Sequence, residues 1–253
     1  MKITSFGGTD TGKNRANNED AYLLNDELGL YAVADGVGGS EGGEVASRMA
    51  VETLAASMPD LLGDKDRTPP AGLVRAVDPA LSALQLAITL TNRTIRQARA
   101  ETPALAGMGT TLTTLLLRGK HAFIAHVGDS RAYLLRSGEF TQLTNDHSLV
   151  GEQVRHGVIT REQARTSPYR HVITRALGID EEVTIDLEKH PLLRGDRLLL
   201  CTDGLTEMVD DAEISGVLGG ADPREAVRKL IDAANRGGGV DNITAVVVWV
   251  TEV

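Results

Sequence analysis

Short apolar runs alternate along the chain with longer stretches whose apolar residues recur at helical spacing. The short runs are separated in several places by turns that contain glycine, which is typical of β-strands. Strands are predicted at residues 3–6, 21–24, 30–34, 111–117, 121–127, 131–136, 197–202 and 243–250. Because three of these runs lie close together between residues 109 and 143, the sequence predicts an antiparallel meander there.

Three longer segments have the periodicity of amphipathic helices. Helices are predicted at about 41–58, at about 79–100 and at about 222–236, the last with Pro223 near its first turn. Because strands come in bunches with helices between them, and not in strict alternation, the sequence predicts an α+β fold with antiparallel sheets.

Two polar segments interrupt the pattern of strands and helices. Residues 59–70 contain charged residues and prolines and are predicted to form a surface loop. Residues 148–180, which include TREQARTSP, are predicted to form a small helical flap. Since no stretch resembles a linker between two cores, we expect one domain over residues 1–253.

The net charge limits the kinds of molecule that the protein is expected to bind. The chain has 26 Lys and Arg against 35 Asp and Glu, a net charge of -9. A nucleic-acid-binding protein would need a basic face, so no nucleic-acid partner is expected, whereas bound cations would suit this excess of acids. We also expect a monomer.

The single cysteine and the short apolar runs indicate in which cellular compartment the protein is expected. With Cys201 alone, no intramolecular disulfide can form, which favours a reducing environment. The first residues, MKITSFGG, lack the apolar region of a signal peptide, and runs such as AVVVWV (245–250) are too short to span a bilayer. A cytoplasmic protein without a membrane partner is therefore expected.

The stretch GGTDTGKN (7–14) begins like a phosphate-binding P-loop, with four residues between Gly7 and Gly12 and a lysine after the second glycine. Asn14 stands where that pattern needs Ser or Thr, and the next apolar run has the character of a strand instead of a helix. We therefore interpret the match as chance, in a turn between two strands that delivers Arg15.

Acidic residues stand where many of the predicted strands begin or end. The positions are Glu19 and Asp20, Asp35, Asp129, Asp203 and Asp241. One Asp-Gly pair alone is more often ordinary turn chemistry. Several such acids at one sheet edge would repel one another unless a cation neutralised them, and oxygen ligands without a cysteine or histidine set favour Mg²⁺ or Mn²⁺. Two such ions about 3.5–4 Å apart can share a water, lower its pKa and direct it at phosphorus.

Neighbouring residues suit the same interpretation. Five glycines fall within DGVGGSEGG (35–43), which would let a backbone carbonyl reach a metal. Arg15 lies four residues before Glu19, and a guanidinium matches phosphate oxygens with its planar fork.

With these residues in place, the chain resembles the metal-dependent protein phosphatases of type 2C, in their compact bacterial form. The matching stretches follow the order of that family and cover nearly the whole chain. They are RANNEDA (15–21), AVADGVGGSEGGEVAS (32–47), GMGTTLTTLLL (107–117), HVGDSRAYLLRSGEFTQLTNDHSLV (126–150), VITRALG (172–178), LLLCTDGLTEMV (198–209) and GGGVDNITAVVV (237–248).

The resemblance implies a central β-sandwich of two antiparallel sheets flanked by α-helices, a four-layer αββα arrangement with the metal site at one edge. By position, Asp35 would bridge two metals and the Gly36 carbonyl would bind one of them. Asp203 and Asp241 would complete the first metal site, and Glu19 would hold the second ion through water.

The same resemblance assigns the remaining candidate residues. Asp129, together with Asp203, would build a third and weaker metal site. Arg15 would bind the substrate phosphate, and residues 148–180 would be the variable flap that touches protein substrates.

The implied activity is hydrolysis of phosphoserine and phosphothreonine in cytoplasmic proteins by a metal-bridged hydroxide. It would require Mn²⁺ or Mg²⁺, and it would reverse signalling by a Ser/Thr kinase whose phosphorylated targets are the partners. Two alternatives stay open. One is a non-catalytic pseudophosphatase that binds phosphoproteins, which would be expected to have lost a carboxylate. The other is a phosphatase of sigma-factor regulators.

One departure from the family leaves the proton donor open. Some relatives carry a histidine soon after the Asp-Gly pair, where this chain has Val37 and Gly38. Metal-bound water or another residue, such as His147, would then protonate the leaving group. A cysteine-based mechanism is excluded, because Cys201 lies in an apolar run and position 207 is Glu where that mechanism needs Arg.

Overall fold

The computed structural model describes residues 1–63 and 78–253, without the side chains of residues 39–41. Its strands form two antiparallel sheets with the orders β1-β11-β10-β7-β8 and β2-β3-β5-β6-β9, and β4 pairs with β3. The strands are β1 (Lys2–Asp10), β2 (Asp20–Asn25), β3 (Leu30–Val37), β4 (Gly109–Thr110), β5 (Leu112–Arg118), β6 (His121–Val127), β7 (Arg131–Arg136), β8 (Glu139–Gln142), β9 (Asp186–Pro191), β10 (Arg197–Cys201) and β11 (Ile243–Glu252).

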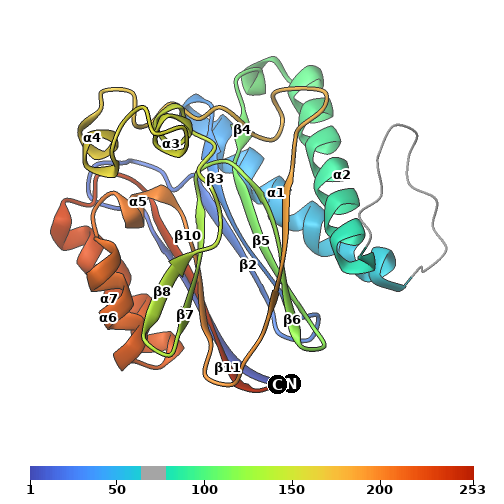
Figure 1. Cartoon of the computed structure of the whole chain (residues 1–253). Helices are drawn as coiled ribbons and strands as arrows, with labels where there is room; N and C mark the ends of the chain where they lie inside the picture. Colours follow the sequence, from blue (N-terminus) through green and yellow to red (C-terminus); the bar gives the residue numbers. More distant parts are fainter. Residues whose placement is uncertain (64–77) are drawn as a thin grey trace.

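Helices cover both outer faces of the paired sheets (Figure 1). The helices are α1 (Gly39–Gly63), α2 (Pro79–Glu101), α3 (Leu149–Arg155), α4 (Arg161–Thr166), α5 (Asp203–Thr206), α6 (Asp211–Gly220) and α7 (Pro223–Gly237), with a 3₁₀ turn at Pro103–Leu105. Helices α1 and α2 pack on the sheet of β2 and β3, and α6 and α7 pack on the sheet of β1 and β11. The predicted four-layer α+β sandwich is therefore confirmed.

Three apolar clusters hold the four layers together, one between the sheets and one under each pair of helices. Strand β3 divides its side chains between two of them. Ala32 and Ala34 face α1 and α2, whereas Tyr31 and Val33 face the other sheet. Because both faces of the central strands are buried, these strands appear in the sequence as continuous apolar runs.

The predicted meander over 109–143 is wrong in one respect. Strands β5 and β6 pair in one sheet and β7 and β8 pair in the other, so the chain changes sheets between Val127 and Arg131. Gly128 permits the crossing with a φ of 114°, a conformation that glycine adopts without strain. Asp129 stands in this crossing.

The first helix is longer than predicted. It continues through Pro59 to Gly63, so the first part of the predicted loop 59–70 is helical, and residues 64–70 of that loop lie outside the described residues. Leu61 and Leu62 pack against the core under α1, and this burial offsets the backbone hydrogen bond that proline cannot make.

Two other expectations, on residues 7–14 and on Cys201, are confirmed by local structure. Residues 7–14 end β1 and turn toward β2 with no helix after them, and the Lys13 N–H donates to the Gly239 carbonyl, so they do not form a P-loop. Cys201 is fully buried within β10. Over the two described stretches of chain, no helix is both long and apolar enough to cross a bilayer.

Two buried histidines pack against each other under the sheet crossing. The rings of His126 and His147 lie 4.6 Å apart between centroids. Burial, with a smaller contribution from His147, lowers the pKa of His126 from 6.5 to about 4. The folded protein therefore keeps His126 neutral, hydrogen-bonded to Thr113 and to the Asn145 carbonyl.

This burial predicts a loss of stability in acid. Below about pH 6.5 the unfolded chain takes up a proton at His126 that the folded chain refuses until about pH 4, so the stability from this residue falls as the pH falls. His126→Gln keeps a donor for Asn145 but does not titrate. Between about pH 7 and pH 5, we expect the unfolding free energy of the wild type to decrease by about 2 kcal/mol relative to this variant.

Urea unfolding of both proteins at the two pH values measures the difference. His156→Gln, at an exposed histidine, is the matched control and should show no such change. A constant difference between wild type and His126→Gln would contradict a neutral, buried His126.

Candidate metal centre

Strand ends from both sheets meet at one edge of the sandwich. The start of β2 pairs with the end of β3, where Asp20 lies opposite Asp35. In the other sheet, the end of β10 pairs with the start of β11, where Cys201 lies opposite Ala245. The acids that flank these strands therefore converge, as the sequence predicted.

The end of β3 holds Asp35 and Gly36 firmly. The Asp35 N–H donates to the Thr111 hydroxyl at 2.9 Å, and its carbonyl accepts from the Thr111 N–H at 2.9 Å. A Cβ on Gly36 would lie 2.1 Å from the Gly43 carbonyl oxygen and 2.6 Å from that of Glu19. Only glycine fits here, because α1 approaches the strand so closely.

On the opposite sheet, Asp203 begins the short helix α5 and Asp241 precedes β11. Gly204 has no room for a side chain either, since a Cβ there would lie 2.0 Å from the Asn242 carbonyl oxygen. The Asn242 N–H donates to the Asp241 carboxylate at 2.8 Å. Both Asp-Gly pairs of the sequence thus mark close approaches between segments.

Asn242 is an organising residue that the sequence analysis missed. Its side-chain oxygen accepts from the Glu19 N–H at 2.7 Å, and its amide donates to the carbonyls of Thr11 and Asn17 at 2.9 Å each. It therefore fixes the segment that carries Arg15 and Glu19 against the start of β11. The sequence signal was present in VDNIT, next to Asp241, but nothing in it revealed these distant partners.

Asp20 joins the cluster, as expected for the acids at the strand ends, although the sequence analysis did not assign it as a metal ligand. It is buried, and one of its carboxylate oxygens accepts from the hydroxyls of Thr202 at 2.8 Å and Thr244 at 2.7 Å. Both threonines belong to the opposite sheet or its edge, so Asp20 links the two sheets at the site.

Asp129 lies in the crossing between β6 and β7, fixed by a buried histidine. The His147 N–H donates to the Gly128 carbonyl at 2.7 Å, and the His147 Nδ1 accepts from the Gly128 N–H at 3.0 Å. Its Nε2 faces Asp186 at 3.1 Å and Arg175 at 3.0 Å. Because His147 is fully buried with both nitrogens engaged, it cannot reach a leaving group, and it is excluded as the proton donor.

The carboxylates raise one another's pKa. Burial, followed by the charges of neighbouring carboxylates, raises the pKa of Asp35 and of Asp129 well above the usual value. Burial also raises the pKa of Asp203, and that of Asp20 to about 7. So many buried like charges are unstable at neutral pH without a compensating cation.

Two buried carboxylate oxygens have no partner within the described part of the protein, which is what a cation-binding position would show. Among the described side chains, Asp20 Oδ1 and Asp203 Oδ1 are buried without a hydrogen-bond partner. A cluster made only of oxygen donors suits hard divalent cations such as Mg²⁺ and Mn²⁺. The residues thus fit the predicted ions, and the assignment of individual ligands stays a prediction.

Arg15 lies at the open side of this cluster. Its guanidinium contacts the Asp241 carboxylate at 2.7 Å, and its side chain is 51% exposed. The hydrogen bond to Asp241 raises the pKa of Arg15, with further contributions from Glu19 and Asp35. One arm of the guanidinium is therefore held by the cluster while the rest remains open to a ligand.

The predicted flap (148–180) reaches the cluster through residues that the sequence did not single out. His171 Nδ1 lies 3.0 Å from Glu207 Oε1, and Arg170 Nε lies 3.9 Å from the same oxygen. Ligand atoms of His171, Glu207 and Asp203 lie within 4.8 Å of one another. Glu207 stands one helical turn after Asp203, so this contact ties the flap to α5.

Comparisons with known proteins agree with this geometry. The profile of the family described as Protein phosphatase 2C matches residues 8–236. The chain is 41% identical over 245 residues to the serine/threonine protein phosphatase PstP of Mycobacterium tuberculosis, covering 96% of this chain but 44% of that relative. It thus spans less than half the length of this relative.

Other relatives match over most of both lengths. The serine/threonine phosphatase stp of Listeria innocua is 39% identical, with 95% of this chain and 93% of that protein covered. The crystal structure of the catalytic domain of PstP in complex with two manganese ions superposes with a TM-score of 0.84 at 39% identity, covering 99% of each chain.

The cluster predicts opposite effects of one substitution with and without metal. Mn²⁺ should raise the melting temperature of the wild type by about 5–10 °C, because the ion binds only the folded cluster. Asp203→Asn removes one repelling charge and one predicted ligand. We expect its metal-free melting temperature to rise above that of the wild type and its Mn²⁺-dependent increase to shrink.

Thermal unfolding with EDTA and with Mn²⁺ measures both effects. Asp232→Asn, at an exposed acid on α7, is the matched control and should behave like the wild type. If Asp203→Asn gained as much from Mn²⁺ as the wild type, Asp203 would not be a ligand.

Proposed function

The chain belongs to the protein phosphatase 2C family, and we propose on that basis that it hydrolyses phosphoserine and phosphothreonine in proteins. The observation that carries the proposal is the pair of partnerless buried oxygens on Asp20 and Asp203, inside a cluster of carboxylates that opens beside the exposed Arg15. A phosphate monoester dianion needs positive charge around it, and this cluster would gather that charge as cations.

In this proposal the position of each residue determines which ion it holds. Asp35, the Gly36 carbonyl, Asp203 and Asp241 hold two Mn²⁺ or Mg²⁺ ions, with Glu19 beside the second. When bound, the ions supply positive charge to the phosphate and lower the pKa of water.

The other predicted residues act beside these ligands. Asp129 with Asp203 forms a third, weaker cation site. Arg15 places its guanidinium fork on the phosphate oxygens while Asp241 orients it. Glycines at 36 and 204 keep the segments that carry the ligands in close contact.

A non-catalytic phosphoprotein-binding role is less well supported. A pseudophosphatase would be expected to lack a ligand, whereas Glu19, Asp35, Asp129, Asp203 and Asp241 are all present. No observation favours sigma-factor regulators as the substrates. The proposed partners are therefore phosphorylated targets of a Ser/Thr kinase in the cytoplasm, with the protein acting as a monomer.

The proposal predicts metal-dependent release of phosphate. The purified protein should hydrolyse a phosphothreonine peptide with Mn²⁺ or Mg²⁺ and lose this activity in EDTA. Asp203→Asn should lower kcat by more than about 100-fold, because a ligand is removed and the chemistry fails. Colorimetric phosphate release measures both. A folded wild type inactive with either ion would overturn the proposal.

Arg15 should act mainly on substrate binding. Arg15→Ala should raise KM for the phosphopeptide by about tenfold, because a charged hydrogen bond to phosphate is lost. Arg15→Lys keeps the charge but not the planar guanidinium, so its KM should lie between those of the wild type and Arg15→Ala. Steady-state kinetics of the three proteins measure this order. Unchanged KM and kcat in Arg15→Ala would remove Arg15 from the phosphate site.

A further inference from the structure

A cleft leads away from the metal centre between the flap and helices α5 and α6. Its volume is about 970 Å³, and it begins at Asp129 and Asp203. This is near the upper end of the volumes of typical ligand sites, about 300–1,000 Å³, and so exceeds what one phosphate group needs. The flap forms one wall, α5 and α6 form the other, and residues of β7 and the segment after β8 form the floor.

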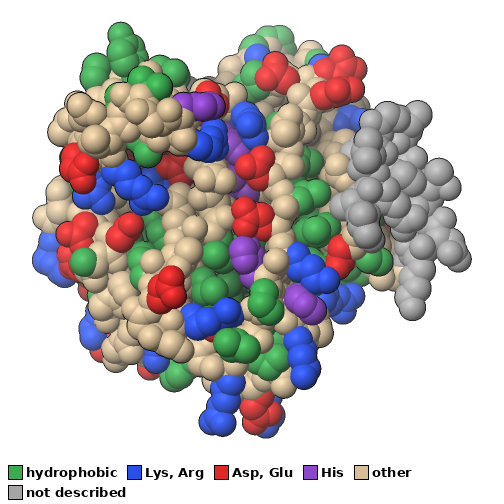
Figure 2. Space-filling view, viewed as in Figure 1, with side chains coloured by type: hydrophobic (Ala, Val, Ile, Leu, Met, Phe, Trp, Pro, Cys, Tyr) green, Lys and Arg blue, Asp and Glu red, His purple; other side chains and the backbone are tan. Residues whose placement is uncertain are grey.

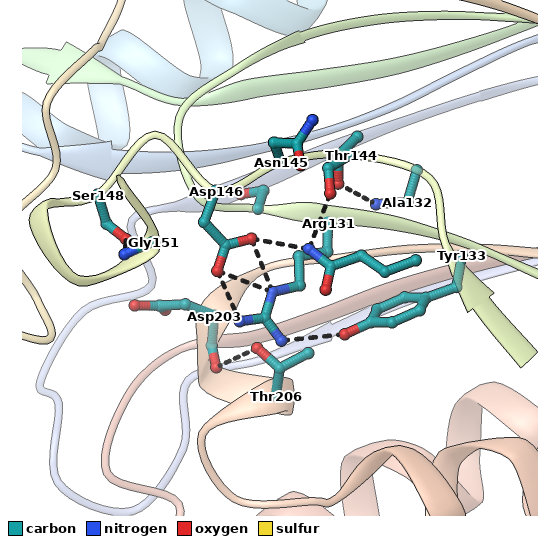
Figure 3. A network of polar contacts seen from close by, with 12 residues as sticks. Arg131, Ala132, Tyr133, Thr144, Asn145, Asp146, Ser148, Gly151, Asp203 and Thr206 are labelled. Carbon is teal, nitrogen blue, oxygen red and sulfur yellow. Dashed lines mark hydrogen bonds and ion pairs between the residues drawn. The ribbon is translucent and has the colours of Figure 1, made fainter. Parts of the chain in front are cut away.

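The charged side chains on the floor of the cleft form an ion pair with each other. Figure 3 shows the Arg131 guanidinium bound to the Asp146 carboxylate. The three contacts measure 2.6–3.1 Å, and Gln142 donates to the same carboxylate at 2.9 Å. Arg131 also donates to the Tyr133 hydroxyl at 3.0 Å. This half-buried pair therefore leaves little charge for a ligand.

The acids of the α6 wall serve the helix that carries them. The Asp210 carboxylate accepts from the Glu213 N–H at 2.9 Å and so caps the N-terminus of α6. Asp211 and Glu213 lie in the first turn, where negative charge is favourable for the helix dipole. These acids thus have a structural reason to be there.

Three of the four flap arginines that line the cleft have no such partner among the described residues, whereas Arg170 lies against Glu207. Arg155, Arg161 and Arg165 line the cleft and are exposed, and none forms an ion pair with a residue in the described parts of the chain. Arg161 begins α4, where a positive charge is unfavourable for the helix dipole. Figure 2 shows basic side chains gathered beneath the flap, facing acidic ones.

We propose that the flap arginines Arg155, Arg161 and Arg165 bind acidic side chains next to the phosphorylated residue of a protein substrate. This inference rests on the proposed phosphatase function and adds a charge preference to it. Arginines in an open cleft attract carboxylates, and opposite charges across an interface set specificity. The acidic α6 wall repels the same side chains and directs them toward the flap.

A polypeptide fits this cleft better than a small anion. The flap also exposes large apolar side chains, with Val158 68% and Tyr169 60% exposed. Neither side chain lines the cleft itself, but a bound polypeptide can extend from the cleft onto the flap surface that carries them, whereas a free anion cannot. The contact of Glu207 with His171 keeps the flap wall in place beside the catalytic cluster.

The experiment compares three phosphothreonine peptides that differ only in the residues flanking the phosphothreonine, which are Glu, Ala or Lys. The wild type should prefer the Glu peptide to the Lys peptide by about 5- to 30-fold in kcat/KM, since exposed ion pairs are individually weak. The double variant Arg161→Glu/Arg165→Glu should remove or reverse this order. The preference should also decrease as salt is added.

A matched control places the same charge change at the far end of the sandwich. Arg118→Glu/Lys120→Glu alters two exposed cations of the β5–β6 turn and should keep the wild-type preference. p-Nitrophenyl phosphate is too small to reach the flap wall, so all three proteins should hydrolyse it at similar rates.

The outcomes separate this inference from the proposed function. Equal kcat/KM for the Glu and Lys peptides in an enzyme active on p-nitrophenyl phosphate would overturn the inference and leave the function standing. The inference would also be overturned if the double variant retained the wild-type preference for the Glu peptide. If no substrate is hydrolysed, the proposed function fails, and fluorescence anisotropy with the same peptides decides the inference. Tighter binding of the Glu peptide would then support it, and equal binding would overturn it.

Discussion

The structure depends on one electrostatic constraint, which is the burial of several carboxylates at a single edge of a β-sandwich. Asp20 and Asp129 are buried there, Asp35 and Asp203 are partly buried, and each of the four has its pKa raised. Such a cluster opposes folding at neutral pH unless cations bind it. The strand pairing, the close glycine contacts and the backbone hydrogen bonds around the edge all hold these carboxylates together against their mutual repulsion. The same free energy of repulsion is what favours the binding of ions.

Much of this could be predicted from the sequence, because the relevant signals are local. An apolar run ending in an acid identifies both a strand and a ligand candidate, as LLLCTDG does for β10 and Asp203. The start of helix α7 could also be predicted from the sequence, since Asp222 caps it and Pro223 is its first residue. The resemblance then supplied the pairing of the two sheets, which no single segment contains.

What could not be predicted depends on contacts between distant segments. The partners of Asn242 lie more than two hundred residues away in the chain, so its role is invisible in VDNIT. The place of β7 in the second sheet follows from the turn at Gly128, which looks like any short hairpin. His147 had the right chemistry for a proton donor, but burial settled its role, and burial is a property of the whole fold.

The apolar layer between the sheets also acts as a spacer for the edge that carries the carboxylates. Glu19 and Asp35 are carried by one sheet, while Asp203 and Asp241 are carried by the other, and Asp20 bonds across the gap to Thr202 and Thr244. Side chains such as Tyr31, Leu200 and Val246 fill that gap. The thickness of the core therefore sets the distance between the two halves of the proposed ligand set. Changes in its packing can alter the choice of ion without touching any ligand.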